Sequence, residues 1–341
     1  MTRLTTRPIT QAARLLMVMI AFVTVPARAE VDEITVAEQY GVAILPLMVM
    51  ERNGLAEKHA RAAGVPGLKV NWVQVAGPSA MNDGLISGAV QFAAQGAPSL
   101  ITLWDKTRRN AAVKGVAAIT TYPLYLITRN PAVQSIRDFT AADKIAVPSI
   151  KISTQAIMLQ IAAAAAWGEG EYGRLDPFTI SLSHPDAMAA FASGTAGVNA
   201  HFTSSPFYEQ EIKQPGTRLL LTNYDILGGP ATALVLTASS RFRDANPRVY
   251  RAVYDGLAEA MEIINTDKPA AARLYLEVAH DRRNTEASIL AIIGNKDYAF
   301  TLRPAKVLRT AQFMAKAGTI RQVPADVAEL FFPEAAALGG D

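Results

Sequence analysis

Polar and aromatic side chains follow the first predicted strand of the sequence, where they could bind a small molecule. Glu38, Gln39 and Tyr40 come directly after the apolar segment Ile34–Ala37. A carboxylate at this place favours a ligand with a cationic part, and a tyrosine ring suits a flat ring. If Glu38 points away or pairs with a basic side chain, a plain sulfonate or carboxylate fits instead. We expect at least one of the three to face a ligand.

The residue patterns of common catalytic sites are missing. The sequence contains no G-x-S-x-G, H-E-x-x-H or P-loop pattern, and it has no cysteine for a disulfide, a thiolate nucleophile or a metal site. Gly168–Gly173 matches G-x-G-x-x-G but follows a predicted helix instead of a strand, so we interpret it as a loop. No metal or cofactor is expected. Of the four histidines, His201 is the functional candidate, and His59, His184 and His280 are expected at the surface or at helix ends.

One phrase of the sequence occurs twice. Gly77–Ser99 reads GPSAMNDGLISGAVQFAAQGAPS, and Ser183–Ser205 reads SHPDAMAAFASGTAGVNAHFTSS. Each copy predicts a helix, a Ser-Gly pair that ends it and a short apolar strand, although the alignment needs a gap of one residue. In open α/β sheets, ligands bind outside the carboxyl ends of strands. Two such units would therefore direct two loops toward one cleft.

Two predicted helix starts could bind an anion. The helix of the first copy begins Gly-Pro-Ser-Ala without an acid in its first turn, so its N–H groups and positive dipole end are open, unless Ser79 only caps it. The helix of the second copy has Asp186 in its first turn and is the poorer anion site. Ser153 and Thr154, next to Lys151, begin another helix and form a better candidate in the second half.

The candidate ligand-binding residues come from predicted strand ends, helix starts and a predicted hinge. They are Glu38, Gln39, Tyr40, Gly77, Ser79, Ala80, Gly96, Ala97, Tyr122, Lys151, Ser153, Thr154, His201, Thr203 and Ser204. Gly96 and Ala97 belong to the loop after the first repeated strand, and Tyr122 lies near the hinge. His201, Thr203 and Ser204 are expected in the loop after the second repeated strand, which we predict at Gly197–Ala200.

Strands and helices alternate along most of the chain. This pattern predicts an α/β fold with two doubly wound mixed sheets and a ligand cleft between two lobes. After Leu236 the pattern predicts a helical C-terminal region, with helices at Asn246–Ile264, Pro269–Val278, Thr285–Ile293 and Arg303–Ala317. The chain has no linker-like segment, so the lobes should be joined by short crossings near Thr121–Thr128 and Tyr224–Gly229.

The N-terminus has the pattern of a secretory signal peptide. Basic residues precede the apolar segment Leu15–Val25, and Ala27-Arg28-Ala29 forms an A-x-A cleavage site. This segment is shorter than the roughly 20 residues that span a membrane. Cleavage after Ala29 removes four arginines and no acid, which leaves 33 − 4 = 29 basic residues against 30 acidic ones. The mature chain then has no excess of basic charge for nucleic acid.

Several segments resemble the periplasmic substrate-binding proteins of ABC importers, in the branch that takes nitrate, sulfonates, taurine and thiamine precursors. The first segment is Ile34–His59, ITVAEQYGVAILPLMVMERNGLAEKH. Gly77–Lys106 resembles the second block of that family, and Lys144–Gln155 and Ser183–Pro206 resemble blocks of its second lobe. Leu227–Pro230 resembles its return crossing. The order of these segments covers nearly the whole mature chain.

The resemblance implies a type II-like binding protein that is not an enzyme. The implied organisation is a signal peptide at 1–29, lobe 1 at 30–122, lobe 2 at 123–226, and at 227–341 the return to lobe 1 with the C-terminal helices. It would capture a small anionic or zwitterionic organic molecule, such as a sulfonate, taurine, nitrate or a related carboxylate. As a monomer free in the periplasm, it would deliver this ligand to a membrane permease. The alternatives are a sensor subunit that docks on a receptor, and a thiamine-pyrimidine-precursor binder or enzyme on the same scaffold, although the cysteine-rich motif of that enzyme has no counterpart.

Overall fold

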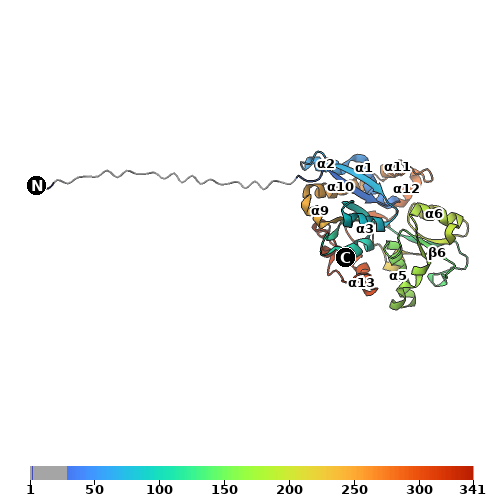
Figure 1. The fold of residues 1–341 in the computed structure, drawn as a ribbon. Helices are drawn as coiled ribbons and strands as arrows, with labels where there is room; N and C mark the ends of the chain where they lie inside the picture. The colour runs from blue at the N-terminus through green and yellow to red at the C-terminus, as the bar shows by residue number, and fades with distance from the viewer. Residues whose placement is uncertain (1, 3–28, 341) are drawn as a thin grey trace.

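The structure is a computed structural model that describes residue 2 and residues 29–340 (Figure 1). The predicted signal peptide lies outside the described residues except for Thr2 and Ala29. The described part forms two α/β lobes side by side, each built on its own β-sheet. Among these residues, no helix is long and apolar enough to cross a membrane.

The first lobe contains a six-stranded sheet with the strand order β11-β4-β10-β3-β1-β2. β1 is parallel to β2 and β3, whereas β10 is antiparallel to its neighbours β3 and β4. The strands are β1 Glu33–Glu38, β2 Lys69–Gln74, β3 Phe92–Gly96, β4 Val113–Thr121, β10 Thr232–Ser239 and β11 Ala299–Phe300. The sheet is therefore mixed, and one of its inner strands comes from the last third of the chain.

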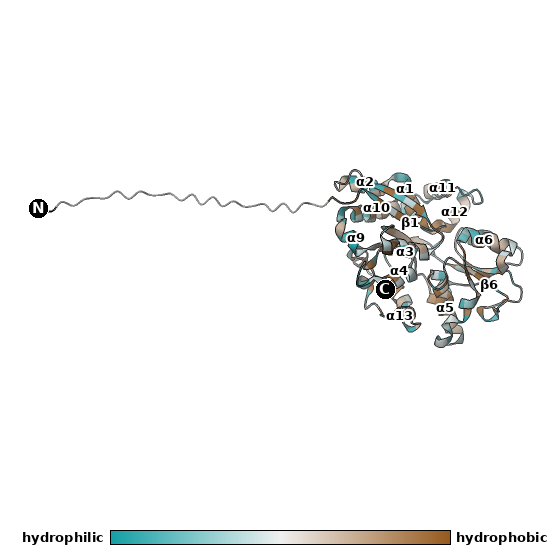
Figure 2. Cartoon of the chain, in the orientation of Figure 1, coloured by the Kyte–Doolittle hydropathy of each residue, from teal (hydrophilic) through white to brown (hydrophobic). Residues whose placement is uncertain are grey.

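Helices from both ends of the described part of the chain cover this sheet. Early ones are α1 Leu45–Asn53, α2 Leu55–Ala62, α3 Pro78–Ser87 and α4 Ala97–Thr107; the predicted C-terminal helical region contributes α9 Ser240–Ala245, α10 Pro247–Thr266, α11 Lys268–Val278, α12 Glu286–Ile293, α13 Val307–Lys316, α14 Val327–Leu330 and α15 Pro333–Ala336. In Figure 2, hydrophobic colours mark the sheet around β1, whereas α2 and α9 carry hydrophilic colours. Most buried side chains of these strands and helices belong to one large core that continues into the second lobe, and a smaller cluster lies between the sheet and α3 and α4.

The side chain of Glu30 binds the start of α10. Its Oε2 accepts a hydrogen bond from Val249 N at 2.8 Å, and its Oε1 accepts one from Arg248 N at 3.1 Å. Arg248 Nε donates a further bond to the same carboxylate. The carboxylate thus accepts hydrogen bonds from N–H groups that have no partner within the helix. Its negative charge also lies at the positive end of the dipole of this 20-residue helix.

The second lobe contains a five-stranded sheet with the order β7-β6-β8-β5-β9. Its strands are β5 Tyr125–Thr128, β6 Lys144–Val147, β7 Thr179–Ser181, β8 Val198–Thr203 and β9 Arg218–Thr222. Its helices are α5 Thr154–Trp167, α6 His184–Ser193, α7 Phe207–Glu211 and α8 Asn223–Leu227. β6 is parallel to β7 and β8, and β5 is antiparallel to β8 and β9. This sheet is mixed as well.

The repeated phrase forms the same unit in both lobes. α3 ends at Gly88 and α6 at Gly194, and these glycines have φ angles of 82° and 73°, the left-handed conformation that ends a helix. Each helix is followed by a strand whose first residue, Phe92 or Val198, is fully buried. The helix–glycine–strand prediction is confirmed. The strand bounds were wrong, because β3 runs on to Gly96 and β8 runs on to Thr203.

The chain passes between the sheets twice. Residues 122–124 join β4 to β5, and residues 223–231 join β9 to β10. Asn223 ties these crossings together: its Oδ1 accepts from Leu124 N at 2.8 Å, and its Nδ2 donates to Tyr122 O at 3.3 Å. Both crossings lie where the sequence placed them, while the residue limits of the lobes stay a prediction.

Candidate functional site

A small cavity lies between the lobes at the strand ends. Six of the predicted residues line it: Gln39, Tyr40, Gly96, Tyr122, Ser153 and Thr154. Gln155 and His184 also line it, and neither was predicted. This inner cavity measures about 20 Å³, which is room for a water molecule and not for an organic ligand. An organic ligand can enter only when the lobes or side chains around it move apart.

A larger cavity opens next to the inner one, and Tyr40 lines both. This outer cavity measures about 570 Å³, and its lining includes Glu38, Glu51, Trp72 and Phe207. The loop between α11 and α12 contributes the charged residues Asp281, Arg282 and Arg283. Its walls therefore combine acids, bases and aromatic rings, and the volume falls in the range of small-molecule sites.

Glu38 is the most perturbed carboxyl of this region. It is the last residue of β1 and only 7% exposed, and its Oε2 is buried without a hydrogen-bond partner. Burial, with the nearby Glu51 second, raises its pKa from 4.5 to about 8. At neutral pH the Glu38 carboxyl is thus largely uncharged. A cationic group beside it would stabilise the ionised form.

The lobes lie against each other on both sides of the inner cavity. Val42 N donates to Ser205 O at 3.2 Å, and Ser79 Oγ donates to Ser149 Oγ at 3.3 Å. Gly96 lies so close to Thr154 that a Cβ on the glycine would collide with Oγ1 of the threonine. Predicted residues from the two halves are thus brought together across the boundary.

The helix starts differ in the way that the sequence indicated. α3 begins after Gly77 with no side-chain cap and no acid in its first turn, so Ser79 does not cap it. α6 is capped by Ser183, and Asp186 lies in its first turn. At α5, Ser153 Oγ accepts from Ala156 N and donates to Ser149 O, so Ser153 is already bonded within its own lobe.

The prediction that His201 and Thr203 lie in a loop facing the cleft is wrong. Both belong to β8, and both side chains are fully buried, while Ser204 is 2% exposed. None of the three lines either cavity. His201 bonds inside the lobe to Glu211 and to His184. His184 was expected at the surface or at a helix end. It is the first residue of α6, as the second alternative has it, but it is only 6% exposed and lines the inner cavity.

Other predicted residues lie beside the cavities without lining them. Lys151 is exposed, with a φ of 62°, and Ala80 is exposed on α3. Gly77 contacts Pro148 and Ser149 of the other lobe. Ala97 is buried as the first residue of α4. Among the described residues, no group of three or more histidine, aspartate and glutamate side chains is placed to hold a metal ion.

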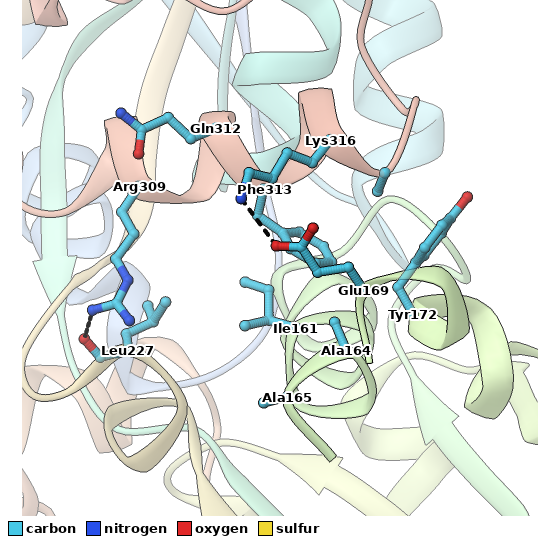
Figure 3. A pocket seen from close by; sticks show the side chains of 11 residues that line it. Ile161, Ala164, Ala165, Glu169, Tyr172, Leu227, Arg309, Gln312, Phe313 and Lys316 are labelled. Atoms are coloured by element: carbon cyan, nitrogen blue, oxygen red, sulfur yellow. Dashed lines mark hydrogen bonds and ion pairs between the residues drawn. The ribbon is translucent and has the colours of Figure 1, made fainter. Parts of the chain in front are cut away.

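A third cavity, of about 350 Å³, lies between the lobes away from the strand ends (Figure 3). The second half of α5 and α13 form its walls, with Ile161 and Phe313 among the apolar side chains. Lys316 and Glu169 form an ion pair across it at 3.0 Å, but both side chains are exposed. Exposed pairs of this kind contribute little to stability. We assign no ligand to this cavity.

Two α/β lobes with cavities between their strand ends define the class of two-lobed periplasmic binding protein folds. The alkanesulfonate-binding protein SsuA from Xanthomonas axonopodis pv. citri, bound to MOPS, has 19% sequence identity and a TM-score of 0.67, over 90% of this chain and 98% of that one. The periplasmic aliphatic sulphonate-binding protein SsuA from Escherichia coli has 18% identity and a TM-score of 0.63, over 89% of this chain and 92% of that one.

The periplasmic nitrate-binding protein NrtA from Synechocystis PCC 6803 is similar too, with 14% identity and a TM-score of 0.65, over 91% of this chain and 85% of that one. At these identities the similarity shows the fold. No curated protein sequence matches this chain. Residues 27–279 match the NMT1-like family, which is most of the chain. The chain belongs to the NMT1-like family.

Proposed function

We propose that the mature chain is the solute-binding component of an ABC import system, which captures a small organic molecule in the periplasm and delivers it to a membrane permease. The observation that carries this proposal is the pair of adjoining cavities between the lobes, because residues of both lobes line them. A ligand held there contacts both lobes at once and stabilises their closed arrangement. The solved structures of similar fold include sulfonate-binding and nitrate-binding proteins, which agrees with this role.

The ligand class follows from the ionisable groups of the outer cavity. Glu38 and Glu51 lie on its first-lobe side, and Arg282 and Arg283 lie on the α11–α12 loop. A zwitterion with an amine and a sulfonate or carboxylate would find a partner for each end. A plain anion would be attracted by the arginines but would gain nothing from the acids. We therefore favour a taurine-like or amino-acid-like zwitterion over nitrate.

The decisive experiment is a native mass spectrum of the protein purified from the cells that make it. We expect a retained small molecule at one copy per chain. Added back at 100–1,000 times its dissociation constant, this ligand should raise the free energy of unfolding by roughly 3–4 kcal/mol. If no ligand is retained and a panel of sulfonates, amino acids, carboxylates and pyrimidines leaves the melting temperature unchanged, the proposal fails.

We further propose that the chain is exported and cleaved after Ala29. The bonds of Glu30 to the start of α10 support this cleavage site, because the first residue of the cleaved chain would then be bonded to the folded protein. N-terminal sequencing of the protein from the periplasmic fraction should begin at Glu30. A retained Met1 would contradict the cleavage.

Turnover of a candidate ligand, instead of binding at one molecule per chain, would favour the enzyme alternative.

A further inference from the structure

The third cavity lies beside the crossing that returns the chain to the first lobe (Figure 3). Leu227, the last residue of α8, lines it, and α13 forms the wall on the side of the first lobe. Two side chains at the start of α13 bind this crossing: Arg309 Nη1 donates to Leu227 O at 2.8 Å, and Lys306 Nζ donates to Gly228 O at 2.8 Å. The first-lobe wall of the cavity is therefore fixed to the crossing itself.

The opposite wall, α5, extends from the third cavity to the inner cavity. Thr154, the first residue of α5, lines the inner cavity, and Ile161, Ala164 and Ala165 line the third one. At 1.5 Å per residue, Ala165 lies roughly 16 Å along the helix axis from Thr154. Between these ends, α5 packs against α8 of the second crossing. Because α5 is one continuous helix of the second lobe, a rotation of that lobe moves both of its ends.

The crossings determine how these two ends move. They join the lobes, so a rotation of one lobe against the other turns about them. Tyr122 and Leu124 of the first crossing line the inner cavity, whereas Leu227 of the second crossing lines the third cavity. The axis of rotation therefore passes between the two cavities. When the lobes move apart at the inner cavity, the far end of α5 moves toward α13.

The walls of the third cavity carry apolar surface that such a movement would bury. Ile161 and Phe313 are only half-buried, and Ala165 is exposed. The walls already touch at one edge, where the ring of Tyr172 meets that of Phe313 edge-on with ring centres 6.4 Å apart. Closer contact between α5 and α13 would remove more apolar surface from water, and this burial stabilises the arrangement in which the inner cavity is open.

We propose that the third cavity controls the balance between the open and closed arrangements of the lobes, because it narrows as the inner cavity opens. Its effect on ligand binding rests on the proposed function. Without a ligand, contact between α5 and α13 favours the open arrangement, which a ligand can enter. A bound ligand stabilises the closed arrangement and separates these walls again. A group that fills the third cavity therefore holds the cleft closed and tightens binding from a distance.

The test fills the cavity by chemical modification. The chain has no cysteine, so a single introduced thiol can be modified at a chosen place. Ala165→Cys puts a thiol on the α5 wall, and a bulky aromatic maleimide attached to it fills the cavity. The same protein before modification is the reference, because it folds before the reagent is added. Ala189→Cys is the matched control, since Ala189 is an exposed residue of α6 that lines none of the three cavities.

The first measurement is small-angle scattering of the mature protein without a ligand. We expect modification of Ala165→Cys to reduce the radius of gyration, because the filled cavity holds the lobes closed. Modification of Ala189→Cys should not reduce it, and Ala165→Trp should match the modified cysteine variant without any reagent. A larger radius would mean that the third cavity widens together with the cleft, and an unchanged radius would mean that it takes no part in lobe movement. Either result would overturn the proposal.

The second measurement is titration calorimetry with taurine as the probe. Modification of Ala165→Cys should tighten taurine binding by about tenfold, the gain expected when a closed form populated at about 10% becomes the main form. Modified Ala189→Cys should bind taurine as the wild type does. Weaker or unchanged binding in modified Ala165→Cys would overturn the control of binding. If taurine binds to none of these proteins, the ligand class under the proposed function is at fault, and the scattering result alone decides this inference.

Discussion

Gly77 faces Pro148 across the boundary between the lobes, and a Cβ on Gly77 would lie 2.5 Å from the backbone oxygen of Pro148. The same Cβ would lie 2.8 Å from Ser149 Oγ. Gly77 has a φ of −176°, an extended conformation that any residue adopts. The need for glycine here therefore comes from the neighbouring lobe and not from the backbone of α3.

Gly77→Ala should hold the lobes apart without unfolding either one. The methyl group meets backbone atoms of Pro148, which can yield only by moving the lobe. We expect weaker ligand binding, by about 1–3 kcal/mol, the usual cost of overpacking. Small-angle scattering should show a larger radius of gyration than for the wild type. The control is Gly67→Ala, because nothing lies within 4 Å of that Cβ. Unchanged scattering and affinity in Gly77→Ala would contradict this role.

Glu38→Gln should change how stability depends on pH. The folded carboxyl has a pKa of about 8, and the ordinary value of 4.5 applies to the unfolded chain. Between these pH values the unfolded chain has lost the proton and the folded chain retains it, so the wild type loses stability as pH rises from 4.5 to 8. The variant lacks this loss, and its stability relative to the wild type should rise by roughly 1 kcal/mol per pH unit in that window. Urea unfolding at several pH values measures it.

The exposed acid Glu262 supplies the comparison for that experiment. Glu262 is an exposed residue of α10, and the stability of the Glu262→Gln variant should depend on pH as that of the wild type does. A parallel result for Glu38→Gln and Glu262→Gln would mean that the Glu38 carboxyl is not protonated in the folded protein. If the ligand carries a cation that pairs with Glu38, its binding at pH 7 should release a proton, which calorimetry in buffers of different ionisation enthalpy detects.

Ser79 tests whether the start of α3 binds an anionic group. If the anionic end of the ligand binds at this helix start instead of at Arg282 and Arg283, Ser79→Ala should weaken binding by about 1–2 kcal/mol, the scale of one hydrogen bond to a charged group. Ser79→Asp should weaken it further, because it places a negative charge where the anion binds and satisfies the helix dipole itself. Both variants should melt near the wild-type temperature, since Ser79 is exposed. Wild-type affinity in Ser79→Asp, measured by titration calorimetry, would rule out an anion at this helix start.

Glu30→Gln tests the hydrogen bonds between the Glu30 side chain and the start of α10. Burial opposes ionisation of Glu30, but the bonds from Val249 and Arg248 outweigh it and lower its pKa. The stabilisation is therefore present above the ordinary value of 4.5 and is lost as pH falls through the lowered value. At pH 7 the variant should lose about 1 kcal/mol of stability, and at low pH the difference should disappear. The exposed neighbour variant Asp32→Asn should show no such loss in the same melting experiments.

The parts of the fold that depend on local chemistry could be predicted. Gly88 and Gly194 end their helices in the left-handed conformation, and Ser153 caps α5, because these effects need only neighbouring residues. The extent of β8 could not be predicted in the same way. His201 and Thr203 are polar residues of a kind that is common in loops, but both are buried in β8. The partners that make this possible, Glu211 and His184, lie on other elements.

Of the residues that line the two cavities, those at the ends of predicted strands and at the starts of predicted helices could be named from the sequence. Gln39, Tyr40 and Gly96 line the inner cavity as expected. His184 was missed because a histidine at the start of a helix is usually a surface residue, and nothing local indicates that Phe207 covers it. Tyr275 on α11 and Arg282 on the loop after it line the outer cavity together with Glu38. They lie more than 200 residues after Glu38 in the sequence, so only the folded structure shows that they share a cavity.

The position of β10 determines the order in which the molecule can be completed. β3 and β4 are not adjacent in the first sheet, because β10 pairs with both of them. Until residues 232–239 arrive, the inner edges of β3 and β4 have no partner, and the first lobe cannot close while the second is still being made. Contacts this distant in sequence form slowly. If the chain is exported as we propose, this arrangement favours its passage through the membrane, since the first sheet stays incomplete until a strand from the last third of the chain emerges.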